Sequence, residues 1–183
     1  MNAPQWLSTI CPLTSCQLEP LTTNSDHLVW HATLTFTKWN PTSNMPLPTR
    51  KERYGKTMIV GKDRNRSVVE IELTRRLREA GWQAGWVDSF GGAPKVWGEW
   101  LAKPSSFPSA LRQFITETDG VTGRKGGKPD IVAWQGDSIA KVVFLECKGP
   151  GDEISQKQEE WLRAALCGGM SFQQFAVAKW SMA

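Results

Sequence analysis

Hydrophobic and polar residues alternate along several short stretches of the chain, which is the pattern of β-strands with one buried face. The clearest stretch is Leu28–Thr37, where large apolar residues alternate with Val, His and Thr. Residues 130–134 and 139–148 are rich in β-forming residues, and the turn-like segment 135–138 separates them. This order predicts a β-hairpin. The other predicted strands are residues 82–90 and 172–180.

Two segments have apolar residues at the spacing of an amphipathic helix. The first is Ser67–Ala80. The second begins at Ser155 and ends before Gly168, and Ser155 with Gln158 has the form of a capping box. A shorter helix is predicted at Ser109–Thr118. The hairpin is therefore predicted to lie between helices.

Two acids and a lysine lie at the ends of the hairpin strands. Asp130 begins the first strand, and Glu146 and Lys148 close the second. Because side chains alternate along a strand, Glu146 and Lys148 emerge on one face and Cys147 on the other. Symmetric pairing about the turn at 135–138 would set Asp130 opposite Val143. Asp130 is then expected to meet Glu146 only if the chain bends or the strands twist.

Two carboxylates and an ammonium are groups that metal-dependent hydrolysis of a phosphodiester uses. Mg²⁺ prefers oxygen ligands and keeps several waters, so Asp130 and Glu146 are predicted to hold it. The backbone carbonyl of Cys147 is predicted as a further ligand, with its sulfur in the core. Lys148 is predicted to orient the attacking water and to offset charge on the phosphate. The alternative is that these residues are solvated surface charges, since short motifs often occur by chance.

The helices on either side of the hairpin each offer one more polar side chain. Glu70 shares the inward stripe of Leu73 and Leu77, whereas Glu72 is predicted on the wetter side of the helix. Because carboxylates are seldom buried without a partner, Glu70 is predicted as a third acid near the metal. The alternative is that Glu70 is an ordinary acid in the first turn of its helix, where the helix dipole stabilises it. Gln158 is predicted to point toward the acids, to cap its helix, or to do both.

A glycine-rich loop, predicted at residues 119–128, leads to Asp130 and carries Arg124, Lys125 and Lys128. Glycines let a backbone approach a phosphate closely, and the three cations attract it. These cations are therefore predicted to bind nucleic acid. The alternative is an ordinary flexible surface loop.

Length and charge narrow the class of protein. The 183 residues suffice for one domain of ordinary size. A net charge of +4 and a pI near 9.0 favour a polyanionic partner. The densest basic stretch, Arg50–Arg66, includes Lys56 and Lys62 and either follows a phosphate backbone or is a solvated linker. His27 and His31 would lie about 13 Å apart on a strand, which argues against a nuclease with a histidine-bound metal.

The cysteines and the apolar segments bear on location. None of the four cysteines has C-x-x-C spacing, which favours a reducing compartment over a disulfide scaffold or a zinc site. No segment resembles a signal peptide, and no apolar run is long enough to span a bilayer. These features predict a cytoplasmic protein. A toxin delivered into a target cell by a dedicated machine would have the same features.

The chain has ten tryptophans, and most are expected in the core or at an interface. Trp97 and Trp100 lie in a Gly-, Pro- and Trp-rich segment at residues 91–125. They are predicted to pack within that segment. The alternative is that they stack on unpaired bases.

Three runs of the sequence together resemble the VRR-NUC domain, a branch of the PD-(D/E)XK nucleases. They are Gly127–Asp130, Glu146–Asp152 and Ile154–Leu162. The resemblance implies an α/β fold in which helices flank a mixed central sheet. The roles it implies are Asp130 and Glu146 as metal ligands, Lys148 as the catalytic lysine, Glu70 as the helix acid and Gln158 as the helix glutamine.

The resemblance also implies Mg²⁺ or Mn²⁺ as cofactor and DNA, often branched, as substrate. The chain resembles stand-alone bacterial and phage members of the family, which tend to be homodimers. It also resembles members that are toxins paired with an immunity protein. Residues 61–183 are then expected to form the nuclease domain with an insert at 91–125, and residues 1–60 an N-terminal extension packed on the core.

Three functions remain open on the sequence. The favoured one is a metal-dependent DNA endonuclease, and the second is an antibacterial DNase toxin neutralised by an immunity protein. The third is an inactive nuclease-like module that only binds DNA or a protein. The presence of both acids and the lysine argues against the third, because a binding module needs none of them.

Overall fold

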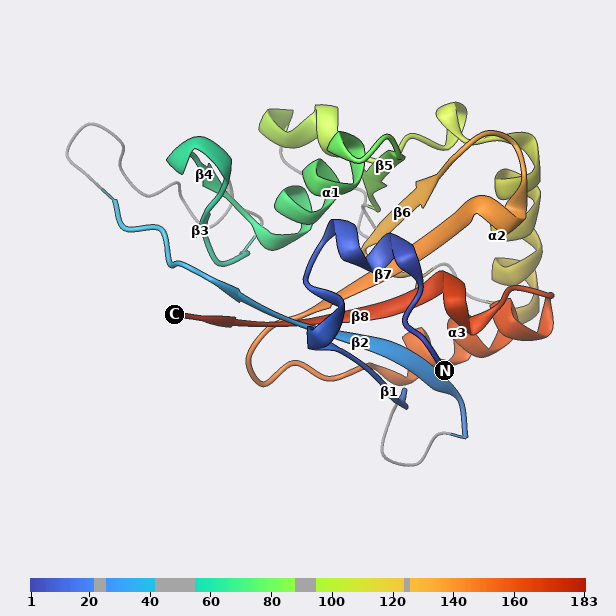
Figure 1. Ribbon diagram of the computed structural model, residues 1–183. Coiled ribbons are helices and arrows are strands. Elements are labelled where there is room, and N and C mark those ends of the chain that lie inside the picture. The colour runs from blue at the N-terminus through green and yellow to red at the C-terminus, as the bar shows by residue number, and fades with distance from the viewer. Residues whose placement is uncertain (22–25, 42–54, 88–94, 124–125) are drawn as a thin grey trace.

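A six-stranded mixed β-sheet forms the centre of the computed structural model, which describes residues 1–21, 26–41, 55–87, 95–123 and 126–183 (Figure 1). In spatial order its strands are β1 (Cys16–Pro20), β2 (Leu28–Phe36), β8 (Phe175–Met182), β7 (Val142–Lys148), β6 (Ile131–Trp134) and β5 (Gln83–Trp86). Strand β8 runs parallel to both of its neighbours, and the other adjacent strands are antiparallel. A separate two-stranded sheet pairs β3 (Ile59–Val60) with β4 (Arg66–Ser67).

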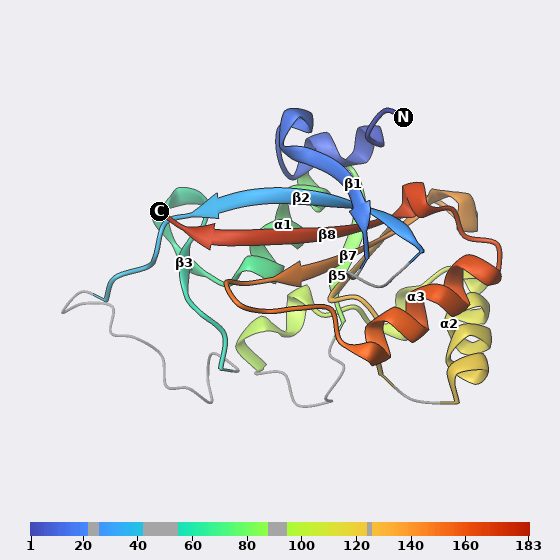
Figure 2. The same ribbon diagram turned by 90° about the horizontal axis from the view of Figure 1, so that it is seen from below.

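Helices cover both faces of the central sheet, so the predicted α/β class with a mixed, flanked sheet is confirmed. The α-helices are α1 (Val69–Glu79), α2 (Ser109–Thr122) and α3 (Gln156–Cys167). The 3₁₀ helices are Gln5–Thr9, Leu13–Ser15, Lys62–Arg64, Lys95–Trp100, Pro104–Ser106, Ile139–Lys141 and Phe172–Gln174. Figure 2 shows the N-terminal 3₁₀ helices on one side of the sheet and α2 and α3 on the other. Within the described ranges, every helix is too short or too polar to traverse a lipid bilayer.

Alternation along β7 sends neighbouring side chains into two different hydrophobic layers. Leu145 packs in the layer that contains Leu73 and Leu77 of α1. Phe144 packs in the other layer, where its ring lies 5.2 Å from that of Trp161 in α3, centroid to centroid. Because even-numbered positions of β7 face α3, Glu146 and Lys148 emerge on the α3 side of the sheet.

The pairing of β6 with β7 differs from the predicted hairpin. Ile131 lies opposite Leu145 and Trp134 lies opposite Val142, so the connection covers residues 135–141 rather than 135–138. The extra residues form the 3₁₀ helix Ile139–Lys141, which begins where the hydroxyl of Ser138 accepts a hydrogen bond from the backbone N–H of Ala140. The predicted pairing of Asp130 with Val143 is therefore wrong. Continuing the observed register by one residue sets Asp130 opposite Glu146, without the predicted bend.

Three other boundaries also differ from the predictions. Residues 119–122, predicted as loop, form the last turn of α2, which ends at Gly123 in the left-handed conformation, where φ is 63°. The strand predicted at 82–90 covers Gln83–Trp86, and residues 88–90 lie outside the described ranges. The last strand begins at Phe175 because the 3₁₀ helix Phe172–Gln174 precedes it.

The predicted N-terminal strand is confirmed as β2, which pairs with β1 on one side and with β8 on the other. His31 was expected on the polar face, but it is buried, with 5% of its surface exposed. Its Nδ1 lies 3.7 Å from Oε2 of Glu19 on β1. Burial lowers the pKa of His31, the nearby Lys179 lowers it further, and Glu19 opposes both effects. His31 is therefore neutral in the folded protein at neutral pH.

The contribution of His31 to the free energy of unfolding is expected to fall as the pH drops below about 6.5, the ordinary pKa of histidine. The folded-state pKa of His31 is depressed, so the unfolded chain takes up a proton at a pH where the folded chain does not, and acid favours unfolding. Urea unfolding of the wild type and His31→Gln between pH 7.5 and 5.5 checks this. The variant should lose less stability across that range, and His27→Gln, the control, should behave as wild type. Equal losses for His31→Gln and the wild type would contradict the assignment.

Candidate active site

Asp130 and Glu146 lie beside each other at one end of β6 and β7, each held by the backbone of the opposite strand. The backbone N–H of Cys147 donates to Oδ2 of Asp130 at 2.9 Å. The backbone N–H of Asp130 donates to Oε2 of Glu146 at 3.2 Å. The register of the hairpin therefore places two carboxylates, 16 residues apart in sequence, on adjacent strand ends.

Lys148 and Gln158 complete this group on the α3 side of the sheet. Nζ of Lys148 lies 2.9 Å from Oε1 of Glu146 and donates to Oε1 of Gln158, also at 2.9 Å. Nε2 of Gln158 donates to the same carboxylate oxygen of Glu146 at 2.5 Å. Oε1 of Gln158 also accepts a hydrogen bond from the backbone N–H of Ser155, and the capping box is complete. Gln158 thus both caps α3 and contacts one of the acids, Glu146, the two roles that the sequence left open.

Glu70 reaches the same region from α1. It is buried, as its predicted place on the inward stripe requires, and its Oε1 lies 2.5 Å from Nζ of Lys56. Glu72, predicted on the wetter side, is buried as well. The prediction was wrong because the guanidinium groups of Arg75 and Arg76 cover Glu72 and bond to its carboxylate.

Burial raises the pKa values of the three carboxyl groups, and crowding raises those of Asp130 and Glu70 further. Burial, and next the charge of Glu146, raise the pKa of Asp130 to about 7, although Lys56 opposes this. Burial also raises the pKa of Glu70 and of Glu146, while Lys56 and Lys148 respectively lower it. Carboxyls that cannot all ionise together need additional positive charge if they are to remain deprotonated at neutral pH.

The donor set fits a hard divalent cation. Mg²⁺ and Mn²⁺ bind carboxylate and carbonyl oxygens, and Mg²⁺ needs only one or two carboxylates because it keeps water and substrate oxygens as its other ligands. Asp130 and Glu146 supply such carboxylates, and burial raises the pKa of both. Within the described ranges, no three Asp, Glu, His or Cys side chains form a ready metal cage. A metal here would therefore fill its remaining positions with water or, when DNA is bound, with substrate oxygens.

Cys147 contributes backbone atoms to the site and a side chain to the core. Its thiol is buried in the layer of Leu145 and Leu73, as predicted. Burial raises the pKa of this thiol well above its ordinary value, and the neighbouring Asp130 raises it further. The sulfur is consequently an uncharged core group and takes no part in the polar cluster.

Of the three cations predicted to bind nucleic acid, only Lys128 lies within the described residues, and it forms an ion pair. Lys128 donates to both carboxylate oxygens of Asp119, at 3.0 and 2.8 Å, and Nε1 of Trp161 donates to Oδ1 of Asp119 at 3.0 Å. Lys128 therefore links the segment before β6 to Asp119 at the end of α2. Asp119 in turn is linked to α3 through Trp161. Arg124 and Lys125 lie outside the described residues.

Close backbone packing accompanies these links. Gly127 has a φ of +84°, and a Cβ at this position would lie 2.2 Å from the backbone oxygen of Lys157 in α3. A residue without a side chain is required there, so that the segment before Asp130 can lie against the first turn of α3.

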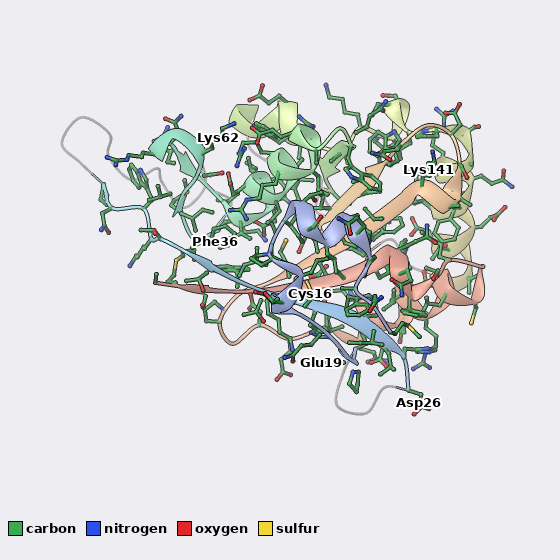
Figure 3. All side chains as sticks on the ribbon, in the orientation of Figure 1. Cys16, Glu19, Asp26, Phe36, Lys62 and Lys141 are labelled. Carbon is green, nitrogen blue, oxygen red and sulfur yellow. The ribbon has the colours of Figure 1, made fainter. Side chains whose placement is uncertain are left out.

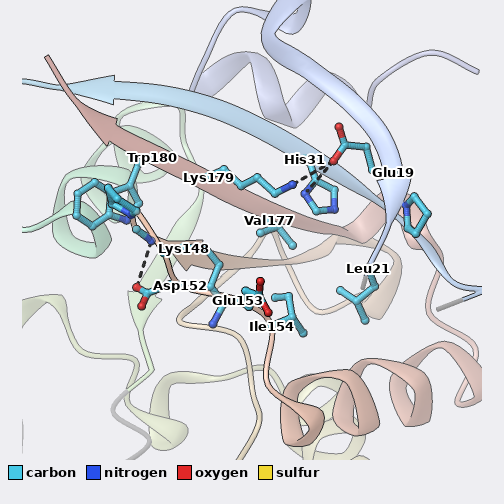
Figure 4. A pocket seen from close by; sticks show the side chains of 14 residues that line it. Glu19, Leu21, His31, Lys148, Asp152, Glu153, Ile154, Val177, Lys179 and Trp180 are labelled. Carbon is cyan, nitrogen blue, oxygen red and sulfur yellow. Dashed lines mark hydrogen bonds and ion pairs between the residues drawn. The ribbon is translucent and has the colours of Figure 1, made fainter. Parts of the chain in front are cut away.

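Two features of the site were missed by the sequence analysis. One is the contact of Lys56 with Glu70, which had no local signal because Lys56 lies in an irregular basic stretch 14 residues earlier. The other is an open pocket of ≈ 640 Å³ beside Lys148 (Figure 4). His31, Lys179 and Trp180 form part of its lining. These residues come from β2 and β8, and only the strand order β2-β8-β7 in the sheet brings them beside Lys148.

Trp100 packs against the core, but its partners lie outside the segment 91–125. It packs against the buried cluster that includes Trp39 and Trp86, and the guanidinium carbon of Arg78 lies 4.8 Å from the centre of its ring. The side chain of Trp97 lies outside the described residues.

Residues 99–179 match the family model of the VRR-NUC domain. Fanconi-associated nuclease 1 of Danio rerio is 50% identical over 38 residues, which are 21% of this chain and 4% of that protein. The Fanconi-associated nuclease 1 homolog of Caenorhabditis briggsae is 25% identical over 138 residues, which are 73% of this chain and 15% of that protein. The chain therefore spans a small part of the length of either relative.

A similar solved structure is the crystal structure of paFAN1 bound to 2nt 5'flap DNA with gap. It is 23% identical in sequence, and the match covers 62% of this chain and 20% of that chain with a TM-score of 0.35.

Proposed function

We propose that this chain, whose residues 99–179 match the family model of the VRR-NUC domain, is a DNA endonuclease dependent on Mg²⁺ or Mn²⁺. The observation that carries the proposal is the convergence of Asp130, Glu146 and Lys148 at the ends of β6 and β7. Burying two neighbouring carboxyls is unfavourable, and a module that only binds DNA has no need of the pair.

In this proposal Asp130 and Glu146 hold the metal, with the backbone carbonyl of Cys147 as a further ligand. The metal, when bound, supplies positive charge to the scissile phosphate and acidifies water. Glu70 is the third acid of the site and lies within electrostatic range of Asp130.

Lys148 is proposed to orient the attacking water and to stabilise the charge that develops on the phosphate. The water oxygen forms a bond to phosphorus as the bond from phosphorus to the leaving oxygen breaks. Gln158 is a positioning residue, because its amide contacts both Lys148 and Glu146 and so fixes one relative to the other.

DNA is the proposed substrate for three reasons. Both relatives are named as Fanconi-associated nucleases. The net charge of +4 favours a polyanion. The open pocket beside Lys148 leaves room for a strand next to that lysine. Branched DNA is the preferred form in this proposal, as the family resemblance implies.

The proposal is tested by incubating the protein with supercoiled plasmid and with flapped, forked and four-way oligonucleotides, in Mg²⁺, Mn²⁺ or EDTA. Cutting is expected with either metal, and branched oligonucleotides should be cut faster than a linear duplex of the same sequence. Cutting that persists in EDTA would rule out the metal-dependent mechanism. Binding to DNA without cutting in either metal would identify a binding module instead.

A further inference from the structure

Lys56 brings a positive charge into the acid cluster from a part of the chain outside the matched VRR-NUC segment. Its Nζ lies 2.5 Å from Oε1 of Glu70, and the side chain of Glu70 is 5% exposed. The backbone nearby is anchored, since Met58 and Ile59 are buried and the carbonyl of Met58 accepts a hydrogen bond from the N–H of Trp39. The ammonium is therefore directed into the cluster by the fold.

The two lysines of the cluster contact different acids. Lys148 pairs with Glu146 on the α3 side, and Lys56 pairs with Glu70 on the α1 side. The charge of Lys56 also acts on Asp130, whose pKa it lowers against the effects of burial and of Glu146. Burial lowers the pKa of Lys56, but Glu70 and Asp130 outweigh burial and raise it above its ordinary value. Lys56 is thus a charged ammonium that stabilises two of the three carboxylates.

A divalent cation held by Asp130 would be attracted by the carboxylates that Lys56 stabilises, those of Asp130 and Glu70. An ammonium and a divalent cation repel each other, and at contact distances in a partly buried site this repulsion is poorly screened. Glu70 cannot give its full charge to the metal while it is paired with Lys56. The side chain of Lys56 is 34% exposed, so its ammonium has a path to solvent.

We propose that Lys56 is a built-in cation that competes with the divalent metal for the acid cluster and so sets the metal affinity of the site. In the metal-free protein its ammonium neutralises Glu70 and Asp130. Metal binding displaces the ammonium from Glu70. This inference rests on the proposed function, because it takes Asp130 and Glu146 as the metal ligands.

Isothermal titration of the full chain with Mn²⁺ at pH 7.5, without DNA, tests the proposal. Lys56→Met keeps the apolar stem and removes the charge, and it is expected to bind Mn²⁺ at least tenfold more tightly than the wild type. Lys56→Arg keeps the charge and should bind within about threefold of the wild type. Lys62→Met is the matched control, since Lys62 belongs to the same basic stretch but pairs with Glu79 at the far end of α1 (Figure 3).

Thermal unfolding gives a second measurement. Without metal, Lys56→Met should melt at a lower temperature than the wild type, because buried Glu70 loses its partner. With saturating Mn²⁺ its melting temperature should rise by more than that of the wild type. Lys56→Gln keeps a hydrogen-bond donor for Glu70 and removes only the charge, so it tests the same claim if the methionine variant fails to fold.

The outcomes separate the two proposals. If the wild type and all variants bind Mn²⁺ with equal affinity, or the uncharged variants bind it more weakly, the role of Lys56 is overturned and the metal site stands. If no variant binds Mn²⁺, both the metal site and the role of Lys56 are overturned.

Discussion

Lys148→Met is expected to reduce the rate of DNA cleavage by about 10²–10⁴-fold, the range lost with a general acid–base or charge-stabilising group. The loss should appear in the cleavage step, because the lysine acts on the water and on charge that develops in the transition state. Binding of DNA should weaken far less, since a single lysine contributes little to the total electrostatic attraction. Cleavage at saturating DNA in Mg²⁺ gives the first quantity, and a DNA titration in Ca²⁺ gives the second.

Lys141→Met is the matched control for this variant. Lys141 is exposed and lies just before β7, at the opposite end of that strand from Lys148 (Figure 3). Both variants remove one positive charge from the same part of the chain. Cleavage by Lys148→Met at the rate of Lys141→Met would show that Lys148 has no part in the reaction.

Asp130→Asn is expected to lower the cleavage rate by on the order of 10³-fold, because metal stabilisation of the transition state is worth several kcal/mol and each 1.36 kcal/mol corresponds to a factor of ten. The amide oxygen of asparagine can still accept the hydrogen bond from the N–H of Cys147 that Asp130 accepts at 2.9 Å. The local backbone should therefore be kept while the charge is lost.

Although Asp130→Asn should slow cleavage, it should stabilise the metal-free protein. Burial and the charge of Glu146 raise the pKa of Asp130 to about 7. A carboxyl whose pKa is raised on folding costs stability increasingly as the pH rises from its ordinary pKa, 3.8 for Asp130, to the raised one, because the unfolded chain ionises first. The full cost is present at pH 8. At pH 8 in EDTA, Asp130→Asn should consequently unfold at a higher temperature than the wild type.

Adding Mn²⁺ should reverse this order. The wild type gains stability in proportion to the logarithm of metal concentration over the dissociation constant, which is about 2.7 kcal/mol at a hundredfold excess over that constant. Asp130→Asn should gain much less. Asp137→Asn, in the exposed connection between β6 and β7, is the control and should respond to Mn²⁺ as the wild type does. An equal response from Asp130→Asn would remove Asp130 from the metal site.

Much of the fold followed from periodicity. The spacing of Val69, Leu73 and Leu77 predicted α1, and the pair Ser155 and Gln158 predicted the start of α3. These features depend on side chains within one or two turns of each other, so they can be read locally. The run Leu28–Thr37 predicted β2 for the same reason, although its place between β1 and β8 in the sheet has no local signal.

Turn geometry marked a limit of the sequence analysis. The 3₁₀ helix Ile139–Lys141 adds three residues to the predicted turn and shifts the register of β6 against β7. A shift in register changes every cross-strand partner. Local patterns therefore identified Asp130 and Glu146 as acids of interest but placed them out of register, and the structure sets them side by side.

By itself the sequence identified the acids, Lys148 and Gln158 as the candidate residues near β6 and β7, because they occupy positions defined by short-range strand and helix patterns. Only the tertiary structure decided that Lys56 enters the acid cluster and that β2 and β8 line a pocket beside Lys148. Those contacts join segments far apart in the chain. Their geometry depends on strand order and on the packing of α1 against the sheet, which no local pattern encodes.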